Sequence, residues 1–207
     1  MTASGRRPRW PGADLPGRRL FVAVPFPSDV ESEIAALVEG VRADGVPGGG
    51  RDVRWVRLDS LHLTLRFLGP TLEDSVAPAT RATRLAAKAV EPFDLSIGGA
   101  GAFPSAARPR ALWLDIRAGE PQLAALAASV DDALRDAGWV FDDKPFRAHL
   151  TLARADGVPA GAAIGVRLVA AAADLDVTFR ADRIGLFESL TGGGPARYEP
   201  IEVVELG

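Results

Sequence analysis

Hydrophobic residues along the chain occur in short apolar runs that alternate with longer stretches of helical periodicity. The run LFVAVP at residues 20–25 is bounded by proline and has the length of a buried strand. Similar runs bounded by Gly, Pro or Asp predict further strands. These are residues 55–56, 61–68, 93–103, 111–117 and 146–153, and three segments near the C-terminus, around 175–179, 183–190 and 198–204.

Three stretches between these strands place apolar residues at the spacing of an amphipathic helix. Residues 28–42 follow a polar N-terminal cap, and residues 73–90 have an alanine-rich face that suggests close packing. Residues 121–137 begin with proline, which is tolerated in a first turn, and end before Gly138. Helices and strands are thus mixed along the chain, and the internal repeat that these elements form leads us to predict an α+β fold.

The chain contains a weak internal repeat of a strand, a helix and a strand that carries the word HLTL. This word occurs at residues 62–65 and again at 149–152, and it contains the only two histidines of the chain. The two copies are roughly half a domain apart, which is too far for a solenoid repeat. We predict a duplicated, bilobal unit whose halves face one another across a cleft. The alternative is two unrelated strands in one ordinary sheet.

Composition narrows the class of protein. With 207 residues and 47% hydrophobic content, the chain can bury a core as one large domain or two small lobes. The absence of cysteine excludes disulfides and cysteine-ligated metals, and it agrees with a reducing cytoplasm. A net charge of −3 argues against a long duplex-binding surface. All but two of the basic residues are arginines, which suit phosphate but are also typical of a GC-rich genome.

No apolar run approaches the roughly 20 residues of a membrane-spanning helix, so we expect no membrane association. Residues 1–18 are rich in Pro and Gly and predict a flexible tail rather than a signal peptide. Residues 19–207 are then expected to form one bilobal domain. Because an internal pseudo-dimer has one reason fewer to associate, we expect a cytoplasmic monomer with no obligatory protein partner.

The two HLTL words carry the candidate chemistry. Because side chains alternate along a strand, His62 and Thr64 share one face while the leucines anchor the other, and His149 and Thr151 repeat this arrangement. A neutral imidazole can take a proton from water, and a protonated one can give a proton to a leaving oxygen. Threonine hydroxyls can donate to phosphoryl oxygens, so the set suits phosphoryl transfer without a metal. Arg154 can balance the charge, although a regular strand would turn it to the opposite face.

Other interpretations of these residues are weaker. A single histidine on a strand is more often structural, but two in the same setting favour chemistry. A zinc site would need carboxylates as further ligands, and no G-x-S-x-G elbow supports a serine nucleophile, so we expect no metal and no cofactor. Large aromatic residues such as Trp55, Trp113 and Phe146 are typical of the core, whereas Phe67 could stack on a nucleobase. The arginines near the motifs are solvated charges or a basic rim for an RNA backbone: Arg54, Arg57, Arg66, Arg108, Arg110 and Arg147.

The paired motifs and their flanks resemble the 2H phosphoesterase superfamily, and within it the RNA 2′,3′-cyclic phosphodiesterases that were once called 2′–5′ RNA ligases. The chain departs from the family pattern at Asp59-Ser60, where Asn is usual, and at Ala148, where Pro is common. The matching stretches cover nearly everything after the tail: RLFVAVPFP from Arg19, WVRLDSLHLTLRFLG from Trp55, ALWLDI from Ala111, KPFRAHLTLAR from Lys144, LFESL from Leu186 and RYEP from Arg197.

This resemblance implies a bilobal fold in which two antiparallel sheets face one another across a central cleft, with helices packed outside. It also implies metal-independent hydrolysis of an RNA terminal 2′,3′-cyclic phosphate to a 2′-phosphate. His62 would be the proton donor to the leaving 3′ oxygen, and His149 would be the proton acceptor that activates water. The remaining assignments are phosphate binding by Thr64, Thr151 and Arg154, and base stacking by Phe67.

Three other functions are compatible with the same motifs. The two histidines could run the reaction backwards as a reversible 2′–5′ RNA ligase. The cleft could instead accept a small nucleotide with a 2′,3′-cyclic phosphate rather than an RNA 3′ end. A binding module that recognises RNA ends would bind the cyclic nucleotide without turnover, so an assay of hydrolysis separates it from the enzymes.

Overall fold

The computed structural model describes residues 16–43, 53–142, 144–155, 159–190 and 196–207. The helices are α1 (Ser28–Ala43), α2 (Glu73–Ala87), α3 (Glu120–Asp136) and α4 (Pro159–Ala171), with a 3₁₀ turn at Leu58–Ser60. The strands are β1 (Arg18–Pro25), β2 (Arg54–Trp55), β3 (His62–Thr71), β4 (Phe93–Phe103), β5 (Ala111–Ala118), β6 (Leu150–Arg154), β7 (Val177–Ala181), β8 (Arg183–Leu190) and β9 (Arg197–Glu205).

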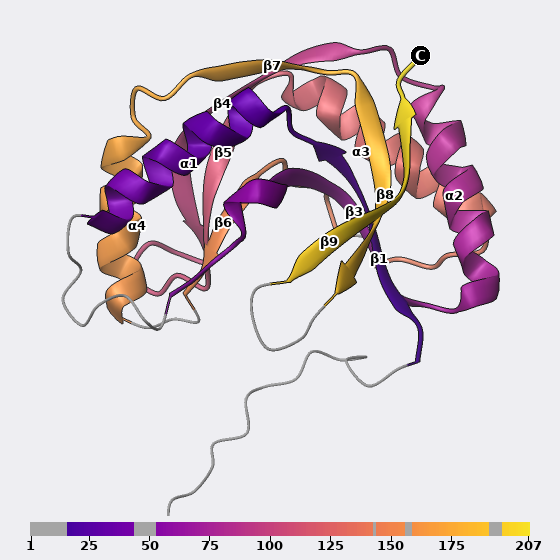
Figure 1. The fold of residues 1–207 in the computed structure, drawn as a ribbon, viewed down its shortest axis with the longest axis horizontal. Coiled ribbons are helices and arrows are strands. Elements are labelled where there is room, and N and C mark those ends of the chain that lie inside the picture. Colours follow the sequence, from indigo (N-terminus) through magenta and orange to yellow (C-terminus); the bar gives the residue numbers. More distant parts are fainter. Residues whose placement is uncertain (1–15, 44–52, 143, 156–158, 191–195) are drawn as a thin grey trace, which may run out of the picture.

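The strands form two antiparallel sheets, as the resemblance implied. The first has the strand order β3-β1-β8-β9 and the second the order β2-β6-β5-β4-β7. Helices α2 and α3 pack against the first sheet, whereas α4 packs against the second and α1 packs against α4 and β7. Figure 1 shows these two helix pairs on opposite sides of the molecule, with the strands between them. The predicted α+β architecture with two sheets and outer helices is confirmed.

The chain passes repeatedly from one sheet to the other. β1 and β3 belong to the first sheet, but β2 and β4 lie in the second. In the later part of the chain, β5, β6 and β7 complete the second sheet before β8 and β9 return to the first. Helix α3 follows β5 along the chain, yet it packs against α2 and β3. Each sheet is therefore built from both earlier and later parts of the sequence.

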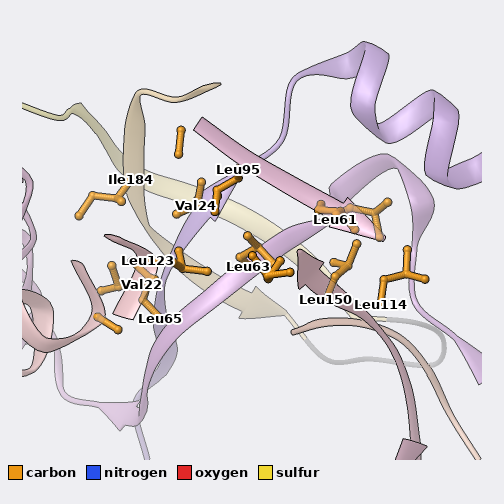
Figure 2. Packing of buried hydrophobic residues seen from close by; sticks show 14 of the residues in the cluster. Val22, Val24, Leu61, Leu63, Leu65, Leu95, Leu114, Leu123, Leu150 and Ile184 are labelled. Atoms are coloured by element: carbon orange, nitrogen blue, oxygen red, sulfur yellow. The ribbon is translucent and has the colours of Figure 1, made fainter. Parts of the chain in front are cut away.

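One hydrophobic core joins the two sheets. The leucines of both HLTL words lie in it: Leu63 is 1% exposed, and Leu150 is equally buried. Figure 2 shows them among side chains from β1, β5 and α3, including Val22, Leu114 and Leu123. Full burial of a leucine side chain stabilises a fold by about 1.5–3 kcal/mol. The leucines therefore anchor both HLTL segments to the same packed interior.

Most predicted elements form within a few residues of their expected bounds, but three bounds were wrong. The strand expected at residues 146–153 begins only at Leu150, because the described residues of the preceding segment line a cavity instead of pairing with the sheet. β3 continues through Gly69 and Pro70 to Thr71, since it is an edge strand, where the missing N–H of proline is tolerated. Helix α2 ends at Ala87 rather than at residue 90.

Helix α4 was not predicted. Its sequence is apolar almost all round and contains two glycines, so it lacks the amphipathic pattern on which sequence reasoning depends. The glycines allow close packing: a Cβ atom at Gly161 would lie 2.6 Å from the Cβ of Ala155, and one at Gly165 would lie 3.3 Å from Leu112. The value of these glycines to the fold becomes visible only in the packed structure.

Two predictions concern segments that lie partly outside the described residues. The flexible tail was predicted for residues 1–18, of which residues 1–15 are outside the description. Arg18 already belongs to β1, where it lies opposite Thr71. Residues 48–50 are three consecutive glycines, a composition that predicts a loop, and they lie outside the described part of the chain.

Candidate functional site

A cavity of about 720 Å³ is lined by residues of both sheets. Its walls come from β2, β3 and β6, from the segment before His149, and from the start of β9. The two HLTL segments, which are distant in sequence, thus line the same cavity. The cavity contains all six residues predicted for the site: His62, Thr64, Phe67, His149, Thr151 and Arg154.

A β-bulge in β3 arranges the first motif. His62 lies opposite Pro25 and Thr64 opposite Ala23, so these two side chains share one face of the sheet. The register then shifts by one residue, and Val22 pairs with Arg66 and Phe21 with Phe67. In a regular strand Phe67 would point away from His62, but the extra residue returns it to the same face. The predicted stacking residue is therefore placed on the cavity face, with 63% of its surface exposed.

The second motif has a bulge at the equivalent place. Thr151 lies opposite Trp113, and after a one-residue shift Ala153 lies opposite Leu112 and Arg154 opposite Ala111. Because Ala111 and Trp113 share a face of β5, Arg154 is returned to the face of Thr151. A regular strand would have turned Arg154 to the opposite face, but β6 includes Arg154 and its bulge returns this residue to the cavity face.

The two histidines have the same hydrogen-bond partner type. Nδ1 of His62 lies 3.0 Å from the carbonyl oxygen of Ser60, and Nδ1 of His149 lies 2.7 Å from that of Arg147. A carbonyl oxygen can only accept, so each Nδ1–H donates to the backbone two residues earlier. Each Nε2 is then left to exchange a proton with a ligand in the cavity. The repeated bond orients both imidazoles in the same way.

Aromatic rings hold both imidazoles in place. The ring of His62 lies 4.8 Å from that of Phe21, and Tyr198 meets it edge-on at the same centroid distance. Phe103 meets the ring of His149 edge-on at 5.2 Å. Such contacts restrict ring rotation and exclude water from one side of each imidazole. The histidines are therefore oriented by packing as well as by hydrogen bonds.

Burial changes the acid–base behaviour of the first histidine. It lowers the pKa of His62 below its ordinary value of 6.5, and the hydrogen bond to Ser60 opposes this shift. Burial also raises the pKa of Tyr198, an effect that the positive charge of Arg154 reduces. With its pKa lowered by burial, His62 is neutral near pH 7, while Tyr198 keeps its hydroxyl proton and can donate it.

Four of the six arginines offered as a basic rim around the motifs line the main cavity. Arg54, Arg57 and Arg147 line the cavity, and so does Arg66, although its bulge directs it mainly toward the core. Arg110 lines a second hollow of about 440 Å³ that shares His149, Thr151 and Arg154 with the main cavity, whereas Arg108 lines neither. Trp55 and Phe146, expected in the core, pack against it and also form part of the cavity wall.

Sequence reasoning missed the aromatic residues that contact the histidines. Tyr198 is the only tyrosine of the chain and the second residue of the RYEP stretch, which was the available indication. Phe21 and Phe103 lie in strands that read as ordinary core segments. Within the described ranges, no group of three or more His, Cys, Asp or Glu side chains could hold a metal ion. The helices of these ranges include none that is long and apolar enough to cross a bilayer.

Comparisons with known proteins agree with this geometry. Residues 25–193 match the 2′-5′ RNA ligase superfamily. The chain is 36% identical over 136 residues to an RNA 2′,3′-cyclic phosphodiesterase of Archaeoglobus fulgidus, covering 66% of this chain and 72% of that protein. It is 27% identical over 190 residues to an RNA 2′,3′-cyclic phosphodiesterase of Methanothermobacter thermautotrophicus, covering 91% and 98%.

A solved structure shares the fold over nearly its whole length. The structure of Escherichia coli LigT in complex with 3′-AMP superimposes with a TM-score of 0.67 and 25% identity, covering 91% of this chain and 98% of that one. The match therefore includes both antiparallel sheets of the fold.

Proposed function

The chain belongs to the 2′-5′ RNA ligase superfamily, and from this membership we propose that it hydrolyses the terminal 2′,3′-cyclic phosphate of RNA to a 2′-phosphate. The proposal uses the two histidines as a general acid and a general base, with no metal taking part. The observation that supports it best is that two histidines from distant segments of the chain, each followed two residues later by a threonine, line one cavity together with both threonines.

The proposed reaction is an in-line displacement at phosphorus. His149 takes a proton from water through Nε2 as the water oxygen attacks, and the bond from phosphorus to the 3′ oxygen breaks. His62 gives its Nε2 proton to that oxygen, which leaves as the ribose 3′-hydroxyl. The phosphate stays on the 2′ oxygen, and the two imidazoles have exchanged protonation states. Water then restores them before the next turnover.

The remaining site residues stabilise the charge that develops on the phosphoryl group. Thr64 and Thr151, which line the cavity from strands of the two different sheets, donate their hydroxyl protons to the non-bridging oxygens. Arg154 supplies a guanidinium on the same face as Thr151 and offsets the added negative charge. Phe67, being exposed on the His62 face, offers its ring to the terminal base.

The lowered pKa of His62 affects how this acid works. A neutral imidazole cannot donate a proton, so the free enzyme holds only a small share of its molecules in the productive state at pH 7. The negative charge of a bound cyclic phosphate opposes the desolvation and raises the pKa of His62 in the complex. Once protonated, a histidine of low pKa is a stronger acid, which favours transfer to the ribose oxygen.

Leaving-group substitution tests the two roles. His62→Ala and His149→Ala are each assayed on a nucleoside 2′,3′-cyclic phosphate and on bis(4-nitrophenyl) phosphate, whose leaving group needs no proton. Loss of a general acid or base lowers the rate by about 10²- to 10⁴-fold. We expect His149→Ala to lose that factor on both substrates and His62→Ala to lose it mainly on the cyclic nucleotide. An equal loss in both variants on both substrates would contradict the assignment of donor and acceptor.

Two controls accompany this assay. Phosphorus NMR of the product distinguishes a 2′-phosphate from a 3′-phosphate, and a 3′-phosphate would disprove the proposed bond cleavage. Turnover is also measured after treatment with EDTA, because a loss of activity that added metal restores would overturn the metal-free chemistry.

A further inference from the structure

The bulge in β3 gives Arg66 a different position from the residues around it. Arg66 lies directly opposite Val22, which is fully buried, so its side chain leaves the sheet on the core side rather than beside Thr64. Only 19% of the Arg66 side chain is exposed. A guanidinium in such a place needs partners, because an unpaired buried charge is strongly unfavourable.

Two different parts of the chain supply these partners. Nε and Nη2 of Arg66 donate to the two carboxylate oxygens of Asp131 on α3, whose side chain is 12% exposed. The guanidinium also lies over the ring of Phe141, with its central carbon 4.7 Å from the ring centroid. The rigid planar fork of arginine can make both contacts at once, which a flexible ammonium cannot.

Phe141 belongs to the stretch that leads to the second histidine. The described residues of 139–149 form neither helix nor strand. The stretch is anchored at its start where the Trp139 N–H donates to the carbonyl of Leu134, 2.9 Å away, and at its end where Leu150 enters the sheet. Between these anchors, Phe141 packs on Arg66 and on the core. Through its contact with Phe141, Arg66 thus links β3, which contains His62, to the segment that precedes and includes His149.

We propose that Arg66 is a positioning residue that sets the relation between the two imidazoles across the cavity. The proposal rests on the acid–base function proposed above, because it matters only if both histidines act on one phosphate. Acid–base catalysis requires both groups to fit one reacting geometry, and a displacement of about 1 Å can cost about 10²-fold in rate. Asp131 and Phe141 act as the fixed points against which Arg66 holds β3.

Three variants test the proposal by steady-state kinetics on a nucleoside 2′,3′-cyclic phosphate. Arg66→Met keeps the apolar stem but loses the fork, and Phe141→Leu is a milder change that loses the stacked ring. We expect kcat to fall by about 10- to 100-fold in Arg66→Met with KM changed by less than about threefold, since substrate contacts stay in place. Arg66→Lys should recover only a part of the loss. The matched control is Arg84→Met, which removes another arginine held by two bonds, here to Glu202 and outside the cavity lining.

A double-mutant cycle with His149→Ala separates positioning from general damage to the fold. If Arg66 acts by placing one imidazole relative to the other, Arg66→Met changes the residual rate by less than about threefold when His149 is already absent. A full, multiplicative loss in that background would overturn the proposal, and so would an unchanged kcat in Arg66→Met. A loss in Arg84→Met as large as that in Arg66→Met would overturn it as well.

A binding measurement keeps the test independent of turnover. Because the chain has only two histidines, ¹H–¹⁵N spectra of the imidazoles report both of them during titration with inorganic phosphate. We expect phosphate to shift both signals with one saturation curve in the wild type and with weaker, unequal curves in Arg66→Met. Identical titrations in the two proteins would overturn the positioning role. A wild type that binds phosphate in this way but hydrolyses no cyclic nucleotide would instead disprove the proposed function.

Discussion

Replacing Asp131 by Asn removes the charge that holds Arg66 while leaving the shape of the side chain almost unchanged. In the wild type both carboxylate oxygens accept hydrogen bonds from the guanidinium. In Asp131→Asn one of these acceptors becomes an amide donor, and the guanidinium is left with a single neutral acceptor. The structure therefore predicts a large loss of stability from a change of very few atoms.

The size of the loss follows from the burial of the pair. Removing one partner of a buried ion pair costs about 3–5 kcal/mol, because the other charge stays buried without compensation. With 19% of Arg66 and 12% of Asp131 exposed, water reaches the pair to some extent, so we expect the lower end, about 3 kcal/mol. For a domain of this size, that corresponds to a decrease in Tm of roughly 6–12 °C.

Urea unfolding measures the free energy of unfolding of three variants: Asp131→Asn, Arg66→Met and the double variant. Their comparison gives the coupling energy between the two residues. We expect the double variant to lose clearly less than the sum of the single losses, since removing the second partner relieves the unpaired charge. Glu202→Gln, which breaks the more exposed pair with Arg84, should have a far smaller effect. Additive losses, or a loss in Asp131→Asn no larger than that in Glu202→Gln, would refute the reasoning.

Three further predictions concern the cavity. Thr64→Val and Thr151→Val should each lower kcat by about 10²-fold with little change in KM, and an unchanged kcat would exclude a role in charge stabilisation. Phe67→Ala should raise KM about tenfold for a linear dinucleotide that ends in a 2′,3′-cyclic phosphate, because a stacking contact with the base is lost. The variant should leave kcat within about threefold of the wild-type value. Because the folded pKa of His62 is depressed, the unfolded chain binds the extra proton below pH 6.5, so stability falls as pH drops below that value. In His62→Gln the free energy of unfolding should depend less on pH below 6.5. If the free energies of unfolding of wild type and variant changed in parallel with pH, the prediction would be contradicted.

Periodicity and motif spacing were sufficient to predict the two candidate histidines and most elements of the fold. The alternation of His62 and Thr64 with buried leucines is a local property of a strand, and the repeat at residues 149–152 marks a second segment of the same kind. Helix α4 was missed because its apolar character has no helical period to detect. The flanking stretches also led to the superfamily, to which the chain belongs.

Several features of the site depend on contacts between residues that are far apart in the chain. Alternation alone places Phe67 and Arg154 on the wrong face, and only the register with β1 and β5 shows the bulges that return them. The same shift sends Arg66 to Asp131, a partner that no local pattern indicates. Tyr198 reaches His62 only because the chain returns to the first sheet at its C-terminal end.

The sequence by itself determined which side chains could do chemistry, since strand alternation and burial of the leucines follow from local sequence and the hydrophobic effect. The tertiary structure alone decided how those side chains meet. Strand register, bulges and the interleaving of the two sheets are set by long-range hydrogen bonds and packing, which a one-residue shift would redirect to the opposite face. The lowered pKa of His62 has the same origin, because it depends on burial by residues that the linear sequence does not place beside it.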